Sequence, residues 1–356
     1  MSTPLAVLAW PAFNNRTGNP YNRLLYDAMD PTAAVVDEFT PQRALTGTYD
    51  VVHVHWPDDF LSQPHVWTAA AYVGATLVLL TWMRMRGAAL VWTAHDAGPH
   101  QSHHPRLERL FWRVFIPQVD GLISLSRAGL EATCAAHPRL RNVPGRVIPH
   151  GHYRSAYPAP LPVDEARAAL DVPAGATVIG HVGRIRPYKN VPHLITCFRR
   201  LDAPDARLYV AGNPSSDALA RRVEAAAAPD ARVTTDLRFV PEAELVQVIS
   251  ASDLIALPYT DILHSGTALL ALSLNRPVLV PARGAMAELQ EQVGAAWVRT
   301  YDDGLTPAVL RDALHWAQTA ARPPRAPLEA LAWPRLAAAH VALYRTAAAN
   351  NTSGRS

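Results

Sequence analysis

Two short segments in the second half of the chain carry residue types that bind phosphate. The first, residues 183–190, reads Gly-Arg-Ile-Arg-Pro-Tyr-Lys-Asn and follows an apolar run that predicts a strand at 177–182. Arg184, Arg186 and Lys189 suit a diphosphate, because arginine offers forked donors and lysine offers a point charge. Solvated surface charge is the alternative, but these cations stand at a strand end and not on a helix face.

The second segment, Ser265-Gly266-Thr267, lies between an expected strand at 254–258 and an expected helix at 267–275. Serine can cap a helix, and glycine lets a ligand approach the backbone closely. The first N–H groups of a helix lack partners and carry partial positive charge, which attracts an anion. An ordinary helix cap is the other interpretation of the same residues.

Other polar residues of this half follow neighbouring strands and are candidates for binding a nucleotide. Gly212 and Asn213 come directly after the expected strand 207–211, and Tyr259 follows the strand at 254–258. Glu288 lies beyond the expected strand 277–281, where a carboxylate could accept hydrogen bonds from ribose hydroxyls. A charge that favours a helix start is an equally good explanation of Glu288.

Acid and imidazole groups follow two expected strands of the first half. Asp58 and Asp59 come after the strand 50–56, and His95 and Asp96 come after the strand 89–93. Ligands of open α/β sheets bind beyond the carboxyl ends of the strands, so these groups are expected at one edge. Loop hydrogen bonds are the alternative role for each of them.

A cluster of histidines in this region does not predict a metal site. The cluster consists of His95, His100, His103 and His104. Its spacing matches no HExxH motif, so we expect no metal.

The totals of the chain indicate a folded protein of two domains. The 356 residues are 49% hydrophobic and 18% charged, which excludes a disordered chain. The net charge of +3 is spread over both halves and does not indicate nucleic-acid binding. Cys134 and Cys197 form no metal or disulfide pattern, and the N-terminus does not resemble a signal peptide. These features fit the cytoplasm.

Strands and helices are expected to alternate from end to end. This pattern predicts an α/β fold with two doubly wound, Rossmann-like domains. A proline-rich linker after residue 149 places the boundary between domains 1–155 and 156–333. A helix at about 334–349 is expected to pack back on the first domain, with a disordered tail at 350–356.

Two helices could contact a membrane. The apolar run 66–83 approaches the length of a membrane span, but it lies between two expected strands, where a crossover helix is required. We expect a packed crossover helix; the alternative is a face that docks on a bilayer, with Arg84 and Arg86 near anionic headgroups. The helix expected at 105–115 carries a basic stripe of Arg106, Arg109 and Arg113. A merely solvated face is the first interpretation of this stripe, and contact with lipid phosphate or a membrane is the alternative.

Several segments resemble the GT-B glycosyltransferases that use nucleotide sugars. They are HVGRIRPYKN, LYVAGN and FVPEAELVQVISASDLIALPY. More narrowly, the chain resembles the bacterial exopolysaccharide β-1,4-mannosyltransferases of xanthan-type assembly, which use GDP-mannose and a lipid-linked oligosaccharide. The segments that carry this second resemblance are NPYNRLLYDAM, YDVVHVHWPDDFL, HGHYR, IRPYKN, LPYTDILHSGTALLALSLNRPVLVP and AWPRL.

The resemblance implies transfer of a hexose onto a hydroxyl of a glycolipid or other glycoside acceptor, with mannose from GDP-mannose as the first choice. It assigns the segments at 183–190 and 265–267 to the diphosphate of the donor, and Glu288 to the ribose. It assigns Asn19 and Tyr21 to a loop on the acceptor side. It also implies a cytoplasmic enzyme, peripheral at the inner face of the membrane.

The resemblance further implies inversion at the anomeric carbon. Retaining relatives place two glutamates eight positions apart, and the corresponding places here, near Ile262 and Leu270, are apolar. Inversion needs a general base, for which we favour Asp58, then Asp59 and Asp96, while His95 is expected to contact the donor sugar. Without an Asp-x-Asp sequence, the cations are expected to stabilise the leaving diphosphate with no metal or other cofactor.

Three other functions remain compatible with these residues. The first is a transferase that uses a UDP-sugar or another nucleotide sugar on a soluble or secondary-metabolite acceptor. The second is a nucleotide-sugar epimerase or hydrolase of the GT-B fold. The third is a non-enzymatic subunit that binds a nucleotide sugar.

Overall fold

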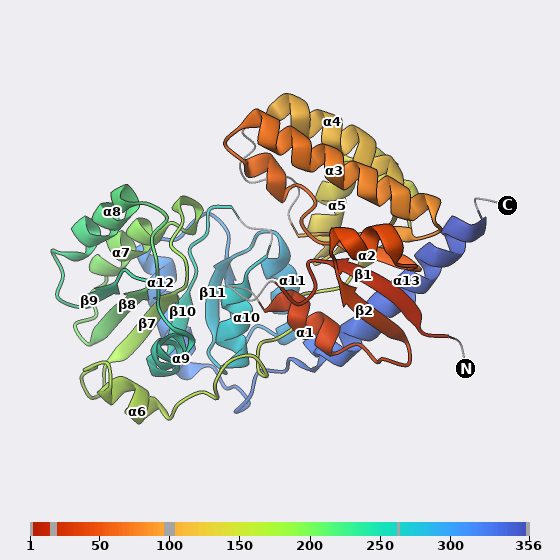
Figure 1. The fold of residues 1–356 in the computed structure, drawn as a ribbon. Helices are drawn as coiled ribbons and strands as arrows, with labels where there is room; N and C mark the ends of the chain where they lie inside the picture. The colour runs from red at the N-terminus through yellow and green to blue at the C-terminus, as the bar shows by residue number, and fades with distance from the viewer. Residues whose placement is uncertain (1–2, 15–19, 96–103, 262–263, 354–356) are drawn as a thin grey trace. The chain divides into compact units, whose positions relative to one another are not determined.

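The computed structural model describes residues 3–14, 20–95, 104–261 and 264–353. The chain forms two compact units, one of Met1–Gly151 with Leu331–Ser356 and one of His152–Ala330 (Figure 1). The sequence placed these divisions at 155 and 333. Each unit contains a six-stranded sheet whose paired strands are parallel. The expected α/β fold with two doubly wound sheets is therefore confirmed.

The sheet of the N-terminal unit has the strand order β2-β1-β3-β4-β5-β6. Its strands are β1 (Leu5–Trp10), β2 (Ala34–Glu38), β3 (Val51–Val54), β4 (Ala89–Ala94), β5 (Val119–Ser124) and β6 (Gly145–Val147). The central strands β3 and β4 are buried along their whole length. Such continuous burial is expected of a parallel sheet that is covered on both faces.

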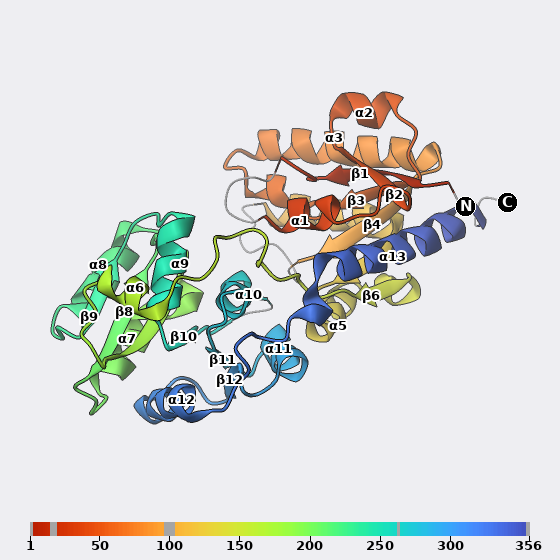
Figure 2. The same ribbon diagram turned by 90° about the horizontal axis from the view of Figure 1, so that it is seen from below.

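Helices cover both faces of this sheet (Figure 2). Helices α1 (Tyr21–Asp27) and α13 (Trp333–Ser353) share one hydrophobic cluster with the sheet. The other cluster contains residues of α2 (Pro41–Thr46), α3 (Val66–Met85) and α4 (Pro105–Phe115), with α5 (Arg127–Ala136) packed against it. The two central strands are therefore held between two layers of helices, which fixes the position of their carboxyl ends.

The C-terminal helix returns to the N-terminal unit and is longer than the sequence indicated. Helix α13 packs on α1, β4 and β5 and continues to Ser353, so the expectation of a disordered tail from residue 350 is wrong for 350–353. Asn351 is buried, and its side-chain amide donates to the carbonyl of Gly87 at 2.9 Å. This contact gives the last turn a fixed partner.

Helix α3 connects β3 and β4, as a crossover helix must, but it is packed along one side only. Only 28% of the most apolar 18-residue stretch of this helix is buried. Its length and composition would allow it to cross a membrane, but core helices of soluble proteins have the same length and composition. The two arginines at its basic end have partners within the N-terminal unit. Arg84 forms an ion pair with Asp120, and Arg86 donates to the carbonyl of Leu45 at 3.1 Å.

The sheet of the C-terminal unit has the order β12-β11-β10-β7-β8-β9. Its strands are β7 (Thr177–Val182), β8 (Ala206–Ala211), β9 (Val233–Asp236), β10 (Leu254–Ala256), β11 (Val278–Pro281) and β12 (Val298–Tyr301). Its helices are α6 (Val163–Ala168), α7 (Val191–Arg199), α8 (Asp217–Ala227), α9 (Glu242–Ala251), α10 (Gly266–Ser273), α11 (Ala285–Val293) and α12 (Pro307–Thr319). Helices α7, α8 and α12 share one hydrophobic cluster with the sheet.

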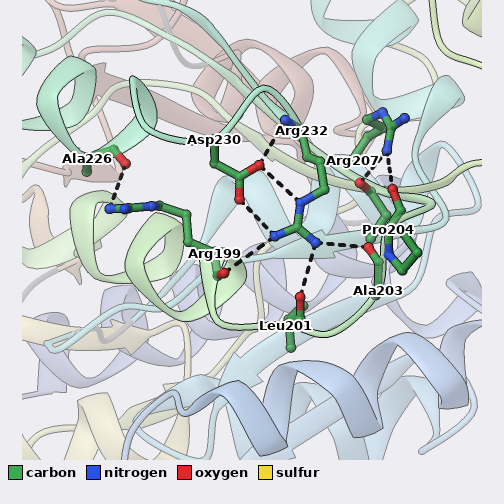
Figure 3. A network of polar contacts seen from close by, with 9 residues as sticks. Arg199, Leu201, Ala203, Pro204, Arg207, Ala226, Asp230 and Arg232 are labelled. Carbon is green, nitrogen blue, oxygen red and sulfur yellow. Dashed lines mark hydrogen bonds and ion pairs between the residues drawn. The ribbon is translucent and has the colours of Figure 1, made fainter.

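One arginine joins several segments of this unit at the start of β9 (Figure 3). Arg232 donates to both carboxylate oxygens of Asp230, at 3.0 and 2.8 Å, and to the carbonyls of Leu201 and Ala203. Its guanidinium also lies 5.0 Å from the ring centre of Phe198. The hydrogen bonds from Arg232 lower the pKa of the Asp230 carboxyl below its ordinary value.

We expect Arg232→Met to lower the free energy of unfolding of the C-terminal unit by about 2 kcal/mol, because hydrogen bonds to a charged group are lost. Urea denaturation at neutral pH measures this loss, and exposed Arg222→Met is the matched control. Because the folded-state pKa of Asp230 is lowered, the contribution of the pair is present at neutral pH and disappears as the pH falls through that pKa. Equal stability of the two variants at neutral pH would contradict this role.

Candidate active site

The centre of the C-terminal sheet is a topological switch point. Strand β7 pairs with β8 on one side and with β10 on the other. In open α/β sheets, ligands bind at such a switch point, beyond the carboxyl ends of the strands. The loops that follow β7 and β10 are joined, because the Thr260 N–H donates to the carbonyl of Tyr188 at 2.8 Å. The two segments that the sequence singled out for phosphate therefore meet at one edge.

Lys189 is a buried cation at this edge. It ends a short 3₁₀ turn at Pro187–Lys189 and is 8% exposed. Its ammonium lies 5.4 Å from the ring centre of Tyr259, and none of the described carboxylates forms an ion pair with it. Because lysine is almost never buried unless it is paired, this position favours an anionic ligand.

The start of α10 contacts the same tyrosine. The Ser265 hydroxyl oxygen accepts from the backbone N–H of Ala268 at 3.1 Å, as a helix cap, and the hydroxyl also donates to the Tyr259 hydroxyl at 3.5 Å. The expected role of Ser265 as a helix cap is therefore confirmed, and this cap still leaves other N–H groups of the helix start available.

Gly183 lies where Lys189 and α10 converge. Its φ is +99°, and a Cβ placed on it would lie 3.4 Å from Thr267 Oγ1 and 3.7 Å from Lys189 Nζ. Glycine adopts this backbone conformation without strain and keeps the space beside it open. The ammonium, the hydroxyl of Thr267 and the start of α10 thus surround one small volume beside the backbone.

Gly212, at the end of β8, packs directly on this turn. A Cβ there would lie 1.8 Å from the carbonyl oxygen of Gly183, closer than any real contact. We expect Gly212→Ala to displace the turn and to lower kcat/KM at least about 100-fold, because small misplacements are costly in catalysis. Initial-rate kinetics measures this loss, and Gly74→Ala, at a helical glycine with no atom within 4 Å of the added Cβ, is the control. Normal activity of Gly212→Ala would mean that the turn does not position the donor.

The other predicted residues of this unit lie near the same edge with less defined roles. Arg184 and Arg186 are exposed on the turn after β7. The carbonyl of Asn213 accepts from the backbone N–H of Ile185 at 2.9 Å, which ties the β8 loop to that turn. Gly266 begins α10, and Glu288 lies half-buried in the first turn of α11, after β11.

The sequence analysis missed one histidine beside this site. His181, in β7, is fully buried, and its Nδ1 donates to the carbonyl of Ala256 at 2.9 Å. Burial and then the charge of Lys189 lower its pKa to about 4, so the ring is neutral. A polar residue in an otherwise apolar strand, two positions before Gly183, is the signal that could have found it.

The predicted acidic residues of the N-terminal unit follow β3. Asp58 is half-buried and directly precedes a short 3₁₀ helix at Asp59–Ser62, and Asp59 is exposed. His95 follows β4, the neighbour of β3, so it lies at the same edge of the sheet. Asp96, His100, His103 and Asn19 lie outside the described residues, as does Ile262.

Tyr21, which was assigned to a loop on the acceptor side, lies in a helix. It is the first residue of α1 and is fully buried. Its ring packs edge-on against His95 at 5.1 Å and Trp333 at 5.3 Å. Proline at the preceding position starts the helix early, and the apolar ring then turns into the core.

Comparisons with known proteins identify the family. A family model described as "Glycosyl transferases group 1" matches residues 176–312. The GDP-mannose:glycolipid 4-beta-D-mannosyltransferase of Xanthomonas campestris pv. campestris is 35% identical over 335 residues, which cover 93% of this chain and 88% of the relative. The chain belongs to the glycosyltransferases.

More distant relatives agree with this family. A D-inositol 3-phosphate glycosyltransferase of Mycobacterium sp. (strain JLS) is 29% identical over 266 residues, which cover 72% of this chain and 57% of the relative. Anabaena HepE in complex with UDP-glucose superposes with a TM-score of 0.62, at 16% identity over 98% of this chain and 99% of that chain. Sucrose-phosphate synthase of Thermosynechococcus elongatus superposes with a TM-score of 0.60, at 16% identity over 99% of this chain and 98% of that chain. The GT-B fold is confirmed.

Proposed function

We propose that this glycosyltransferase transfers mannose from GDP-mannose to a hydroxyl of a lipid-linked oligosaccharide, with inversion and without a metal. The observation that carries the choice of donor and acceptor is the similarity, over nearly the whole chain, to the Xanthomonas enzymes of that name. The geometry around Gly183 supports a diphosphate, but it does not distinguish guanine from other bases.

The cations of the C-terminal unit supply the chemistry that a leaving diphosphate needs. Lys189 provides a buried positive charge, and α10 provides unpaired N–H groups and the hydroxyl of Thr267. Arg184 and Arg186 add forked donors from the same turn. These groups are in place before the reaction, so they stabilise the negative charge that develops as the glycosidic oxygen departs. A divalent ion is not needed for this task.

Inversion requires a carboxylate that removes the proton from the acceptor hydroxyl. Asp58 is the favoured base, because it follows a central strand and is half-buried, whereas Asp59 is exposed. The acceptor oxygen then attacks the anomeric carbon from the side opposite the nucleotide. The anomeric configuration of the product, read by NMR, tests this step.

Thermal-shift measurements with a panel of nucleotide sugars test the identity of the donor. Binding to the folded state raises the apparent stability, so GDP-mannose is expected to raise Tm more than UDP-, ADP- or dTDP-sugars at equal concentration. Formation of mannosylated glycolipid from GDP-mannose then tests transfer. A larger shift with a UDP-sugar would contradict the choice of base, and epimerised or free sugar without acceptor would indicate an epimerase or hydrolase.

The outer faces of α3 and α4 suit the peripheral contact with the membrane that a lipid-linked acceptor requires. Trp67, Val78 and Met85 are 84%, 68% and 65% exposed, and their spacing of 11 and 7 residues places them on one stripe of α3. The neighbouring α4 exposes Leu110 among its arginines. An apolar stripe beside a basic one matches the interface of an anionic membrane, here the cytoplasmic leaflet.

Replacing Trp67 and Val78 together by aspartate is expected to reduce co-sedimentation with vesicles that contain anionic lipid at least about tenfold, because apolar area is lost and negative charge is added. The control is Phe239→Asp in the C-terminal unit, which changes an aromatic residue that is 75% exposed. Equal binding of the two variants, or binding that does not depend on anionic lipid, would contradict this assignment.

A further inference from the structure

The first residues of the C-terminal unit attach to the end of α10. This unit begins at His152, and the backbone N–H of Tyr153 donates to the hydroxyl oxygen of Ser273 at 2.8 Å. The Ser273 hydroxyl in turn donates to the carbonyl of Leu269 at 2.6 Å. A backbone N–H only donates and a carbonyl only accepts, so the direction of both hydrogen bonds is fixed. The backbone of Tyr153 is therefore anchored at the last residue of α10.

The side chain of Tyr153 reaches the first residue of the same helix. A Cβ placed on Gly266, which begins α10, would lie 3.0 Å from the Tyr153 hydroxyl oxygen and 3.8 Å from Cε2 of its ring. Tyr153 is 4% exposed, so this contact is enclosed. The ring therefore lies lengthwise along α10, between the two ends of the helix.

The contact is made at the helix start that borders the candidate diphosphate site. Thr267, the next residue, has its hydroxyl beside Gly183 on the turn after β7. Successive residues of an α-helix point about 100° apart, so Thr267 faces this turn while Gly266 faces Tyr153. The start of α10 thus has a neighbour on each of two sides.

Tyr153 has little freedom to move away from α10. Its carbonyl accepts from the backbone N–H groups of Ala156 at 3.0 Å and Tyr157 at 3.3 Å, which closes a turn. Its ring also packs edge-on against the ring of Tyr157, with centres 5.7 Å apart. Because a close-packed interior transmits displacements, a shift of the Tyr153 ring would shift the start of the helix as well.

A second attachment joins the same segment to the end of α10. The side-chain oxygen of Asn275, two positions after α10, accepts from the backbone N–H of Ala326 at 3.1 Å. The carbonyl of Ala326 accepts from Arg154 Nη2 at 2.5 Å. Asn275 has a φ of +57°, a conformation in which asparagine is enriched. The residue that follows Tyr153 is therefore also connected to the far end of this helix.

We propose that Tyr153 is a positioning residue of the donor site. Its backbone is anchored at the end of α10, and its ring sets the place of the helix start, whose N–H groups and Thr267 hydroxyl receive the diphosphate. Preorganised donors of this kind lose effect when they are displaced by a fraction of an ångström. The segment by which the chain enters the C-terminal unit consequently takes part in donor binding.

This inference rests on the proposed function for the ligand at the start of α10. Gly266→Ala and Tyr153→Phe form a cycle that tests it, because the added methyl presses on the hydroxyl that phenylalanine lacks. We expect Gly266→Ala to raise the dissociation constant of GDP, measured by calorimetry, at least about tenfold, the effect of one misaligned hydrogen bond to a charged group. The double variant is expected to bind GDP within about threefold of Tyr153→Phe alone.

The single variant Tyr153→Phe accounts for every other role of the hydroxyl. Gly266→Ala combined with Tyr209→Phe, which removes a hydroxyl from β8 of the same unit, is the matched control and should bind as weakly as Gly266→Ala. Wild-type affinity in Gly266→Ala, or a failure of Tyr153→Phe to restore binding, would overturn the proposal. A wild-type protein that binds no GDP would instead contradict the proposed donor.

Hydrogen exchange tests the position of the helix start in the protein without ligand. We expect Tyr153→Leu, which shortens the side chain, to speed exchange of the amides at 266–269 at least about threefold, because local opening becomes easier. Because coupling is reciprocal, GDP should slow exchange of the amide at position 153 in the wild type and not in this variant, an effect that a merely structural residue would not show. Unchanged exchange at 266–269 in folded Tyr153→Leu would overturn the proposal, whichever donor the enzyme uses.

Discussion

Lys189→Met is expected to lower kcat/KM for the nucleotide sugar by about 100-fold to 1,000-fold, the usual effect of removing one preorganised group that stabilises the leaving charge. The fold should persist, because methionine fills a similar volume and the variant buries no unpaired charge. Initial rates at saturating acceptor measure the loss. The reason for a large effect is burial: at 8% exposure, the ammonium acts where water screens it little.

Exposed Arg221→Met in α8 is the matched control, since it also removes one positive charge from the same unit. We expect it to change the rate less than threefold, the range of a screened surface charge. If both variants lost activity equally, the effect would come from net charge. If neither lost activity, Lys189 would not contact the donor.

Asp58→Asn is expected to lower kcat by about 100-fold to 10,000-fold, the usual contribution of a general base, while the KM for the donor stays near its original value. Asparagine has nearly the same shape but cannot accept the proton of the acceptor hydroxyl. The measurement is kcat at saturating concentrations of both substrates.

Asp59→Asn provides the comparison one residue further along the chain. We expect it to keep turnover within a few-fold, because the side chain is exposed. Loss of turnover in Asp59→Asn alone would move the base by one position. Near-normal turnover in both variants would assign the base to Asp96.

The fold, and the turn that we propose for the diphosphate, could be located from local signals. Apolar runs alternating with helical patterns identified both sheets, and glycine followed by cations identified the turn after β7. The sequence could predict that Lys189 and the start of α10 lie in the same unit, but not that they lie side by side. Their proximity depends on the pairing of β10 with β7 across the switch point. That pairing joins residues 75 positions apart, such as Ile179 and Leu254, which no local pattern reports.

Tertiary contacts explain what the sequence did not reveal. The resemblance assigned Tyr21 to a loop on the acceptor side, yet its ring is buried against α13. Residues from 350 on were expected to be disordered because they form a chain terminus, but Asn351 donates a hydrogen bond to the distant carbonyl of Gly87. His53 lies in β3 and His55 directly follows it, and only the contacts of the Tyr26 hydroxyl with both rings show that the two histidines are linked.

The central claim is that the turn at Gly183–Lys189 and the start of α10 bind one diphosphate. A double-mutant cycle with Lys189→Met and Thr267→Val, measured as the dissociation constant of GDP by calorimetry, tests it most directly. Residues that share a ligand group are expected to show a coupling of roughly 0.5–3 kcal/mol. We predict such a coupling for GDP and a smaller one for GMP, which has one phosphate fewer. Strict additivity for GDP would show that the two segments bind independently and would contradict the claim.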